Sequence, residues 1–358
     1  MKFSDVLEIK NGRNQKQVEN PNGKYPIYGS GGIMGYADDY ICEPYTVIIG
    51  RKGTINNPIY VETPFWNVDT AFGLQAKKDI LHPKYLYYFC VHFDFEALNT
   101  TVTIPSLTKA NLLNIDIPLP PLAEQTEIVD TLTSVDELIK IKKQQLELFD
   151  ELTKSQFIEL FGDPMTNSNG YELKKYGDLF ELNAGGTPSK QKSEYWENGT
   201  ISWIGSNMCQ NTVIYENDGN YITEEGLKHS SARVFPVDTV LIALVGATIG
   251  KTALLKFETT TNQNVLGVRG IRESGYTPEF IFYYTQGLYQ KFLNIGDGGF
   301  AMASKGFITE LPVPIVDLAL QEQFATFVKQ TDKSKLAVQQ SIAELEELKK
   351  SLMQQYFG

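Results

Sequence analysis

The feature that most constrains this chain of 358 residues is a long segment that occurs twice. Residues 118–162 and residues 314–358 align without a gap, at an offset of 196 positions. Gln125 matches Gln321 in this alignment, and both copies end in the dipeptide Phe-Gly. A repeat of this length indicates a chain that is built from two related structural units.

Each copy of the segment has the apolar spacing of one long helix. Its apolar residues recur in steps of three and four, as in the seam of a coiled coil, with polar interruptions at Lys142 and Thr153 in the first copy and at Thr331 and Lys335 in the second. The seam positions are Ile128, Leu132, Val135, Ile139, Leu146, Phe149 and Leu160 in the first copy, and Phe324, Val328, Val338, Ile342, Leu345 and Leu352 in the second. A helix of about 38 residues is a rod of roughly 55 Å. Two core helices of an ordinary bundle are the alternative, but the length and the duplication favour a helix pair.

The segments that precede the two helices repeat more loosely. "VIIGRKGTI" (47–55) matches "VLIALVGATIG" (240–250), and "PKYLYYF" (83–89) matches "PEFIFYY" (278–284). The first pair indicates buried strands, and the second pair indicates aromatic-rich helices that follow a turn.

The repeat predicts an α+β chain with four parts. Two globular domains of short strands, helices and loops occupy residues 1–117 and 163–313, and a long helix follows each of them, at 118–162 and 314–358. A polar stretch rich in Gly, Asn and Pro, 162–172, links the two copies. The two-fold-like repeat predicts that the helices run antiparallel, with a globular domain at each end of the pair.

Composition limits the functions that this chain can have. The sequence has no run of about 18 apolar residues and no apolar region of a signal peptide, which predicts a cytoplasmic protein. Its three cysteines and three histidines are scattered, so neither a metal site nor a cofactor is expected. The net charge is −11, so any basic surface for DNA must be local.

The stretch "GATIGKT", Gly246–Thr252, resembles a phosphate-binding loop only in part. Such a loop needs GxxxxGK[ST], but the residue five positions before Gly250 is Val245. The loop should also begin a helix, whereas the following "ALLKFETTT" is rich in β-branched residues. We interpret the stretch as a turn after a buried strand.

Two other catalytic patterns are also weak. Asp163, Glu172 and Lys174 could be read as a nuclease cluster, but they lie in and next to the polar linker, which favours a solvated linker. "NPIY" (57–60) is the nearest match to a methyltransferase tetrapeptide, and it lacks the second Pro. A turn is the simpler interpretation.

The whole layout resembles the specificity subunit of type I restriction–modification systems. The resemblance depends on the doubled "IPLPPLAEQ" (117–125) and "VPIVDLALQEQ" (313–323), each leading into a long helix. It is supported by "GKYPIYGSGGIMGY" (23–36) and by "IPSLTKANLLNIDIPLPPL" (104–122). The second copy departs from the pattern, with "VDLALQEQ" in place of "PPLAEQ", and the chain is expected to start inside the first recognition fold.

The resemblance implies a set of partners. Each globular domain would be a target-recognition domain that reads one half of a split double-stranded DNA site. The helix pair would fix the spacer and dock two modification (methyltransferase) subunits, with Leu122, Gln125, Leu318 and Gln321 as docking candidates. ATP-dependent restriction subunits would join, and the methyl transfer and cleavage would belong to these partners rather than to this chain.

The candidate DNA contacts are Arg, Lys, Asn, Gln, Ser, Thr and Gly residues in loops, which suit base edges and phosphates. In the first domain they are Lys10, Arg13, Asn14, Lys16, Gln17, Ser30, Gly31, Arg51, Lys52, Thr54, Ser106, Thr108 and Lys109. In the second domain they are Thr187, Ser189, Lys190, Ser206, Asn207, Thr248, Lys251, Ser304 and Lys305. The two sets share little chemistry, so an asymmetric site is expected.

Two other classes of function remain as alternatives. One is a self-contained DNA-modifying enzyme, which would show turnover without partners. The other is a coiled-coil scaffold without sequence specificity, which would not direct a complex to a defined DNA sequence.

Overall fold

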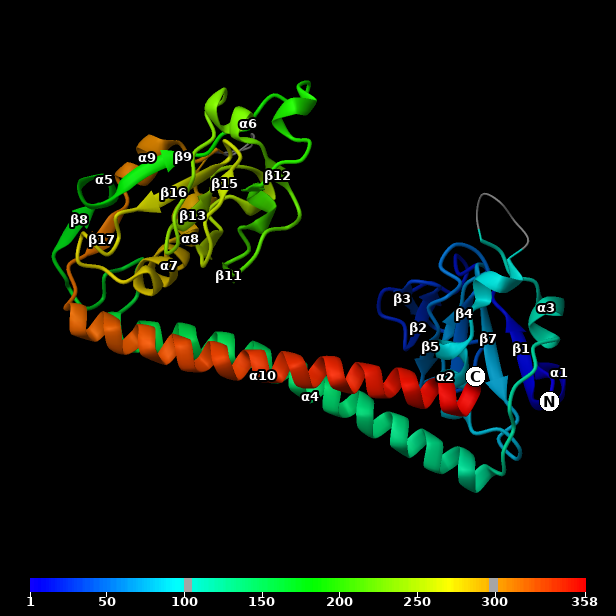
Figure 1. The fold of residues 1–358 in the computed structure, drawn as a ribbon. Coiled ribbons are helices and arrows are strands. Elements are labelled where there is room, and N and C mark those ends of the chain that lie inside the picture. Colours follow the sequence, from blue (N-terminus) through cyan, green and yellow to red (C-terminus); the bar gives the residue numbers. More distant parts are fainter. Residues whose placement is uncertain (100–104, 296–301) are drawn as a thin grey trace. The chain divides into compact units, whose positions relative to one another are not determined.

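The computed structural model describes residues 1–99, 105–295 and 302–358. Ile104, the first residue of one motif quoted above, lies outside the described residues. The chain forms two compact units: unit 1 comprises 1–145 and 338–358, and unit 2 comprises 146–337. Two long helices, α4 (Leu122–Phe161) and α10 (Leu318–Phe357), each contribute one part to each unit (Figure 1).

Both units mix short helices with small sheets. The other elements of unit 1 are α1 (Phe3–Val6), β1 (Leu7–Asn11), β2 (Tyr25–Gly29), β3 (Gly32–Ala37), β4 (Thr46–Gly50), β5 (Ile59–Val61), β6 (Trp66–Asn67), β7 (Ala71–Ala76), α2 (Pro83–His92), η1 (Phe95–Leu98) and α3 (Lys109–Leu113). Those of unit 2 are β8 (Leu173–Lys175), α5 (Tyr176–Leu179), β9 (Glu181–Ala184), η2 (Ser193–Tyr195), β10 (Ile201–Ile204), η3 (Ser206–Met208), β11 (Thr212–Ile214), β12 (Tyr221–Ile222), α6 (Glu224–Lys228), β13 (Val240–Ala243), η4 (Gly246–Thr248), β14 (Thr252–Leu255), β15 (Thr260–Thr261), β16 (Val265–Arg269), α7 (Pro278–Gly287), α8 (Tyr289–Leu293), α9 (Lys305–Thr309) and β17 (Pro312–Pro314).

The main sheets of the two units have the same strand order. Unit 1 has β1-β7-β4-β5, and unit 2 has β9-β16-β13-β14 with β11 added at the edge. Their registers also agree: β4 pairs antiparallel with β7, and β13 pairs antiparallel with β16 over four residue pairs in each case. The expected internal repeat is therefore present in the fold as well as in the sequence.

A second, smaller sheet also repeats. In unit 1, β2 pairs antiparallel with β3 and parallel with β6. In unit 2, β10 pairs antiparallel with β12 and parallel with β15. The central strands β4 and β13 are buried along their whole length, as their unbroken apolar sequences predict.

The aromatic-rich helices form where the sequence predicts them. Both α2 and α7 begin with Pro at the first helical position, where a missing N–H has no cost, and a capping side chain precedes each Pro. The helix predicted at 278–284 is α7, and a second helix, α8, follows it. They meet at Gly287, where Pro164 leaves no room for a Cβ atom.

Ion pairs show that α4 and α10 run antiparallel within each unit. In unit 1, Asp136 pairs with Lys349 at 2.6 Å, and Lys143 pairs with Glu346 at 2.9 Å. In unit 2, Asp150 pairs with Lys335 at 2.5 Å, and the ring of Phe157, later in α4, lies 5.3 Å from the ring of Phe324, earlier in α10. In each unit a later residue of α4 thus contacts an earlier residue of α10, which confirms the predicted direction. Within the described ranges, no helix is both long enough and apolar enough to span a membrane.

The predicted seam is correct in part. Ile128, Leu132 and Val135 are buried, but Leu146 and Phe149 are only half-buried. The pattern missed Phe157 and Phe357, which are 3% and 7% exposed. These two phenylalanines pack into the domain cores of unit 2 and unit 1, and Phe157 also contacts Phe324 of α10.

Candidate nucleic-acid interface

The predicted DNA-contacting loops of unit 1 meet at one edge of its main sheet. Strands β1 and β4 run parallel to each other, on either side of the antiparallel β7. The ends of β1 and β4 and the start of β7 therefore lie at the same edge. The loops 10–17, 50–54 and 67–70 emerge there.

Backbone contacts hold these loops together. The Arg13 N–H donates to the carbonyl of Asn67 at 2.8 Å, and the Leu107 N–H donates to the carbonyl of Arg51 at 2.9 Å. A Cβ atom on Gly50 would lie 3.0 Å from Ser30 Cβ and 1.9 Å from the Thr54 carbonyl oxygen, so this close approach requires glycine. The four loops that the sequence predicts, at 10–17, 28–32, 50–54 and 106–109, are thus neighbours.

Several side chains at this edge are free to contact a ligand. Arg13, Lys16, Arg51 and Lys52 are exposed, and none of them forms an ion pair with any residue that the structure describes. Asn14, Gln17, Gly31 and Thr54 are exposed beside them. Unpaired cations on neighbouring loops create the local positive surface that phosphate binding needs.

Other predicted residues of unit 1 have structural roles. Lys10 pairs with Glu8 at 2.9 Å, and the Lys109 ammonium donates to the carbonyl of Ile9 at 2.9 Å. Thr108 caps α3 by accepting the Asn111 N–H, and Ser106 bridges to Lys52 through the backbone. We therefore revise the assignment of Lys109: its ammonium ties α3 to the sheet.

Unit 2 presents the equivalent edge. The loops after β9 and β13 and the loop before β16 emerge there, as in unit 1. The Gly186 N–H donates to the carbonyl of Thr261 at 2.8 Å, and the Asn262 N–H donates to that of Ile204 at 3.2 Å. The Ala303 N–H reaches the carbonyl of Leu244 at 2.8 Å, which brings in the loop that leads to α9.

The predicted residues of unit 2 divide in the same way. Ser189, Lys190, Asn207 and Lys305 are exposed, and Ser206 is half-buried. The remaining four form hydrogen bonds within the unit. Thr187 donates to the Gln263 side chain at 2.6 Å, and Lys251 donates to the Gln210 side chain at 2.8 Å. Thr248 donates to the carbonyl of Val245 at 3.4 Å, and Ser304 accepts the Phe307 N–H at the start of α9.

Some residues at these edges are not among those predicted from the sequence. Loop 67–70 in unit 1 and loop 262–264 in unit 2 lie among the predicted loops. Arg233 also reaches the unit 2 edge, where it donates to Asn183 Oδ1 at 3.4 Å. The run "NQN" at 262–264 was a visible signal, because clustered amides before a strand are typical of a turn with free hydrogen-bonding groups.

The structure confirms that "GATIGKT" is a turn between strands. A short 3-10 turn, η4, follows the buried β13, and Thr252 then begins the strand β14 rather than a helix. Gly246 and Gly250 have φ of +67° and +74°. A Cβ atom on Gly250 would also lie 2.5 Å from the Phe292 ring. The glycines therefore serve backbone geometry and packing.

The two predicted docking glutamines are buried. Gln125 is 0% exposed; it accepts the His82 N–H at 2.8 Å and donates to the carbonyls of Ile80 and Pro120 at 3.0 and 2.8 Å. Burial lowers the pKa of His82, and its Nδ1 accepts the Lys84 N–H at 3.2 Å at the start of α2. The network joins the starts of α2 and α4.

Gln321 repeats this network in unit 2. It is 0% exposed, accepts the Thr277 N–H at 3.0 Å and donates to the carbonyls of Gly275 and Val316 at 3.4 and 3.0 Å. Because both glutamine side chains are enclosed, we revise their assignment from docking contacts to internal anchors of the long helices. Leu122 and Leu318, at 38% and 45% exposed, remain candidates for docking.

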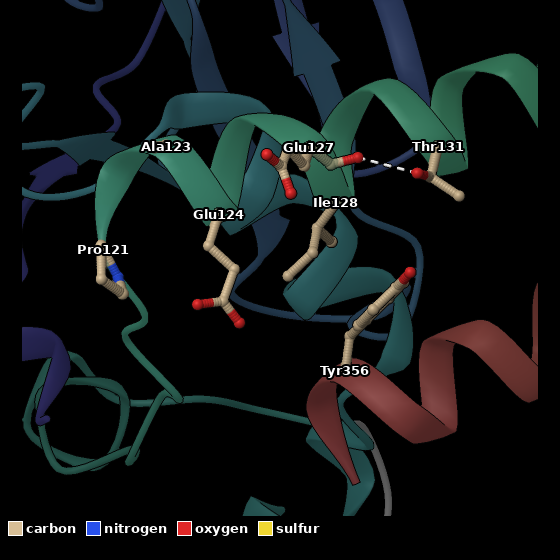
Figure 2. Close-up of a pocket in the computed structure, with 7 residues that line it drawn as sticks. All are labelled: Pro121, Ala123, Glu124, Glu127, Ile128, Thr131 and Tyr356. Carbon is tan, nitrogen blue, oxygen red and sulfur yellow. Dashed lines mark hydrogen bonds between the residues drawn. The ribbon is translucent and has the colours of Figure 1, made fainter.

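A hollow of about 540 Å³ lies beside the start of α4 in unit 1 (Figure 2). Glu124, Glu127 and Ile128 line it from α4, and Tyr356 lines it from α10. The carboxylates make one wall acidic, and Leu122 borders the adjoining hollow. This surface combines charge and apolar contact in the region that the family resemblance assigns to docking.

The cysteines are not candidates for nucleophiles. Cys42, Cys90 and Cys209 are all buried, and burial raises the pKa of Cys42 and of Cys209 to about 12. A thiol in this state is protonated at neutral pH and reacts slowly.

Comparisons with known proteins agree with this architecture. A model of the type I restriction modification DNA specificity domain matches residues 1–148 and 168–347. The specificity subunit of the EcoR124I/EcoR124II restriction enzyme of Escherichia coli is 28% identical over 254 residues, which cover 66% of this chain and 61% of that subunit. The MjaIX specificity subunit of Methanocaldococcus jannaschii is 31% identical over 167 residues, 45% of this chain and 38% of that one.

Solved structures show the same fold. The crystal structure of a type I restriction–modification S subunit from M. genitalium superimposes with a TM-score of 0.60 at 17% identity, covering 100% of this chain and 95% of that one. The matched residues of the family model include most of both units and of both long helices. The chain therefore belongs to the type I restriction–modification DNA specificity family.

Proposed function

We propose that this chain is the DNA sequence-specificity subunit of a type I restriction–modification complex. Each loop edge would read one half of a bipartite, asymmetric DNA site, and α4 with α10 would set the spacer between the halves. The matched part of the chain spans 61% of the length of the Escherichia coli relative, so the roles of the whole complex belong to this proposal.

One observation carries the proposal: the same sheet frame presents two differently composed loop edges. Arg51 and Lys52 follow β4 in unit 1 and are exposed, whereas the buried Leu244 and the half-buried Val245 follow β13 at the equivalent positions, so other loop residues must form that edge. Related frames with different side chains are what two separate half-sites require, because base edges differ in their donors and acceptors.

The proposal assigns the chemistry to partners. Two modification subunits would dock on the helix pair, and ATP-dependent restriction subunits would join them. This chain would have no catalytic turnover and no cofactor of its own, and the complex would act in the cytoplasm, where the cell's DNA lies. Partners that enclose the duplex would supply phosphate contacts that a chain of net charge −11 has only locally.

Sequencing of the DNA methylation pattern tests the proposal. Cells that carry the chain with its modification subunits should methylate one split sequence. Arg51→Ala should relax the first half-site only, at about 1–3 kcal/mol for a lost bidentate base contact. Asn207→Ala should affect the second half-site only. Lys24→Ala is the matched control, since this exposed lysine precedes β2, at the end of that strand far from the loop edge.

Other outcomes would favour the other classes of protein. Methylation, cleavage or ATP hydrolysis by the purified chain alone would identify a self-contained enzyme. A complex that assembles but methylates no defined sequence would identify a scaffold.

A further inference from the structure

The hairpin of β2 and β3 exposes three apolar side chains. Ile33, Met34 and Tyr36 are 55%, 64% and 44% exposed. Single exposed apolar residues are common on protein surfaces. Three of them within one six-residue strand, next to a polar loop edge, form a local cluster that needs a partner surface.

The backbone directs this cluster outward. The register between β2 and β3 shifts after Ile27, so that Tyr28 faces Ile33 and Met34 is the extra residue of a β-bulge. Bulges re-aim a side chain and are common beside binding sites. At the turn, Gly32 has φ of +121°, and a Cβ atom on Gly31 or Gly32 would meet nothing within 4 Å. The tip is therefore open to an approaching molecule.

The hairpin tip adjoins the positive loop edge of unit 1. Ser30 contacts Gly50, which directly precedes the exposed Arg51 and Lys52. The Met34 sulfur lies over Gly29, and the Val68 side chain lies beside the same glycine. Met34 thus packs partly over Gly29 while it stays largely exposed, and with Ile33 it lies beside cations that no described acidic residue neutralises.

We propose that Ile33 and Met34 form a wedge that inserts between base pairs of the DNA bound by unit 1. Proteins that insert Ile or Met side chains at a base step unstack it and bend the duplex, while nearby cations hold the phosphates. The charge of the neighbouring loops makes a duplex the fitting occupant, rather than an apolar protein surface. This inference rests on the proposed function.

Only unit 1 has the short hairpin that carries the proposed wedge. The connection between β10 and β12 replaces the short glycine turn of unit 1 with a longer segment that contains Asn207, Gln210 and Asn211. Distortion of the duplex is therefore expected at the first half-site and not at the second.

Fluorescence of 2-aminopurine tests the wedge, because this base brightens when it is unstacked. The full chain with its modification subunits is bound to duplexes that carry the probe at successive positions of its methylated sequence. Binding of the wild-type complex should increase the 2-aminopurine fluorescence several-fold when the probe is at one position of the first half-site. The double variant Ile33→Ser/Met34→Ser should lose the signal and bind roughly tenfold more weakly, as expected for about 1.4 kcal/mol of lost apolar contact. The recognised sequence should not change.

Two controls separate the wedge from general damage. Ile33→Leu/Met34→Leu keeps the apolar surface and should keep the signal. Val91→Ser removes another apolar side chain of unit 1, 40% exposed on α2, and should have no effect.

Absence of a bright position in the wild-type complex, or an unchanged signal in the serine variant, would overturn the wedge while site-specific methylation still supports the proposed function. Loss of the modification subunits from the serine variant would assign the hairpin to protein docking instead. A wild-type complex that methylates no defined sequence would refute the proposed function, and the wedge with it.

Discussion

At the scale of single residues, Gln125 and Gln321 show how one buried side chain can fix the place where a long helix begins. Each glutamine side chain accepts a hydrogen bond from one backbone N–H and donates hydrogen bonds to two backbone carbonyls. These backbone groups are not paired within a helix or a sheet. A buried polar group without a partner is unfavourable by about 1–3 kcal/mol. Removal of either glutamine side chain is therefore expected to destabilise the protein mainly because it leaves three backbone groups without a hydrogen-bond partner.

We predict that Gln125→Ala lowers the free energy of unfolding by about 2–4 kcal/mol, because three backbone groups lose their partner. Denaturant unfolding followed by circular dichroism measures this. Gln144→Ala, at an exposed position of the same helix, is the control and should change stability by less than about 0.5 kcal/mol. Equal effects of the two substitutions would mean that the network is not an anchor.

Asp238 makes the stability of unit 2 depend on pH in the acid range. Burial alone would raise the pKa of Asp238, but hydrogen bonds from Lys256 and Arg272 outweigh burial and lower the pKa below its ordinary value of 3.8. Lys256 also pairs with the buried Glu279 at 3.2 Å. Because the folded pKa is the lower one, the contribution of Asp238 is complete above pH 3.8 and is lost as the pH falls through the folded value.

The Asp238→Asn variant isolates this contribution. We expect the variant to be less stable than the wild type at pH 7, and the difference between them to shrink below pH 3.8. Thermal melting midpoints at a series of pH values measure it. The comparison is needed because Asp332 acts in the opposite direction: burial raises its pKa. A difference that stays constant down to pH 2 would show that Asp238 is not linked to protonation.

At the scale of elements, side chains near the ends of the long helices pack into the cores of the two units and fix the helices there. Phe157 of α4 is 3% exposed and packs against Phe161, Phe280 and Phe324 in the core of unit 2. We predict that Phe157→Ala destabilises the protein by about 3–5 kcal/mol, through lost burial and a residual cavity. The next residue, Ile158, is 53% exposed, so Ile158→Ala should change stability by less than about 0.5 kcal/mol. Denaturant unfolding of both variants makes the comparison, and similar losses would contradict the assigned packing.

The same helices show what periodicity can and cannot predict. The steps of three and four correctly indicated two long helices and the buried Ile128 and Leu132. They could not indicate that Phe157 and Phe357 also pack against α7 and α2 of the domains, because a position buried against one helix has the same spacing as a position buried against another. Only the tertiary arrangement distinguishes them.

The candidate site was predictable as loops but not as side-chain roles. The loops predicted from the sequence lie next to one another at the two sheet edges, and their contact with DNA stays a prediction. The sequence did not reveal that Lys109 bonds to the Ile9 carbonyl, since these residues are 100 positions apart. Nor did it reveal that Gln125 is enclosed, because a polar residue beside a family motif is ordinarily taken as exposed.

At the scale of the whole molecule, α4 and α10 are the elements that both units share. If the helix pair is a ruler, its length should set the spacer of the DNA site. Deletion of residues 142–148 and 339–345 removes seven residues from each helix and preserves the steps of three and four in both seams. The pair becomes about 10 Å shorter. At 3.4 Å per base pair, we predict a spacer shorter by about three base pairs, with both half-sites unchanged.

Methylation patterns of cells that carry the shortened chain with its partners measure the spacer directly. Deletion of 142–148 alone is the control, because it shifts one seam against the other and should abolish methylation or leave the complex unassembled. A shortened chain that still methylates the original site with the original spacer would contradict the ruler. The half-sites would remain assigned to the loop edges in that case, because Arg51→Ala and Asn207→Ala test those edges independently of helix length.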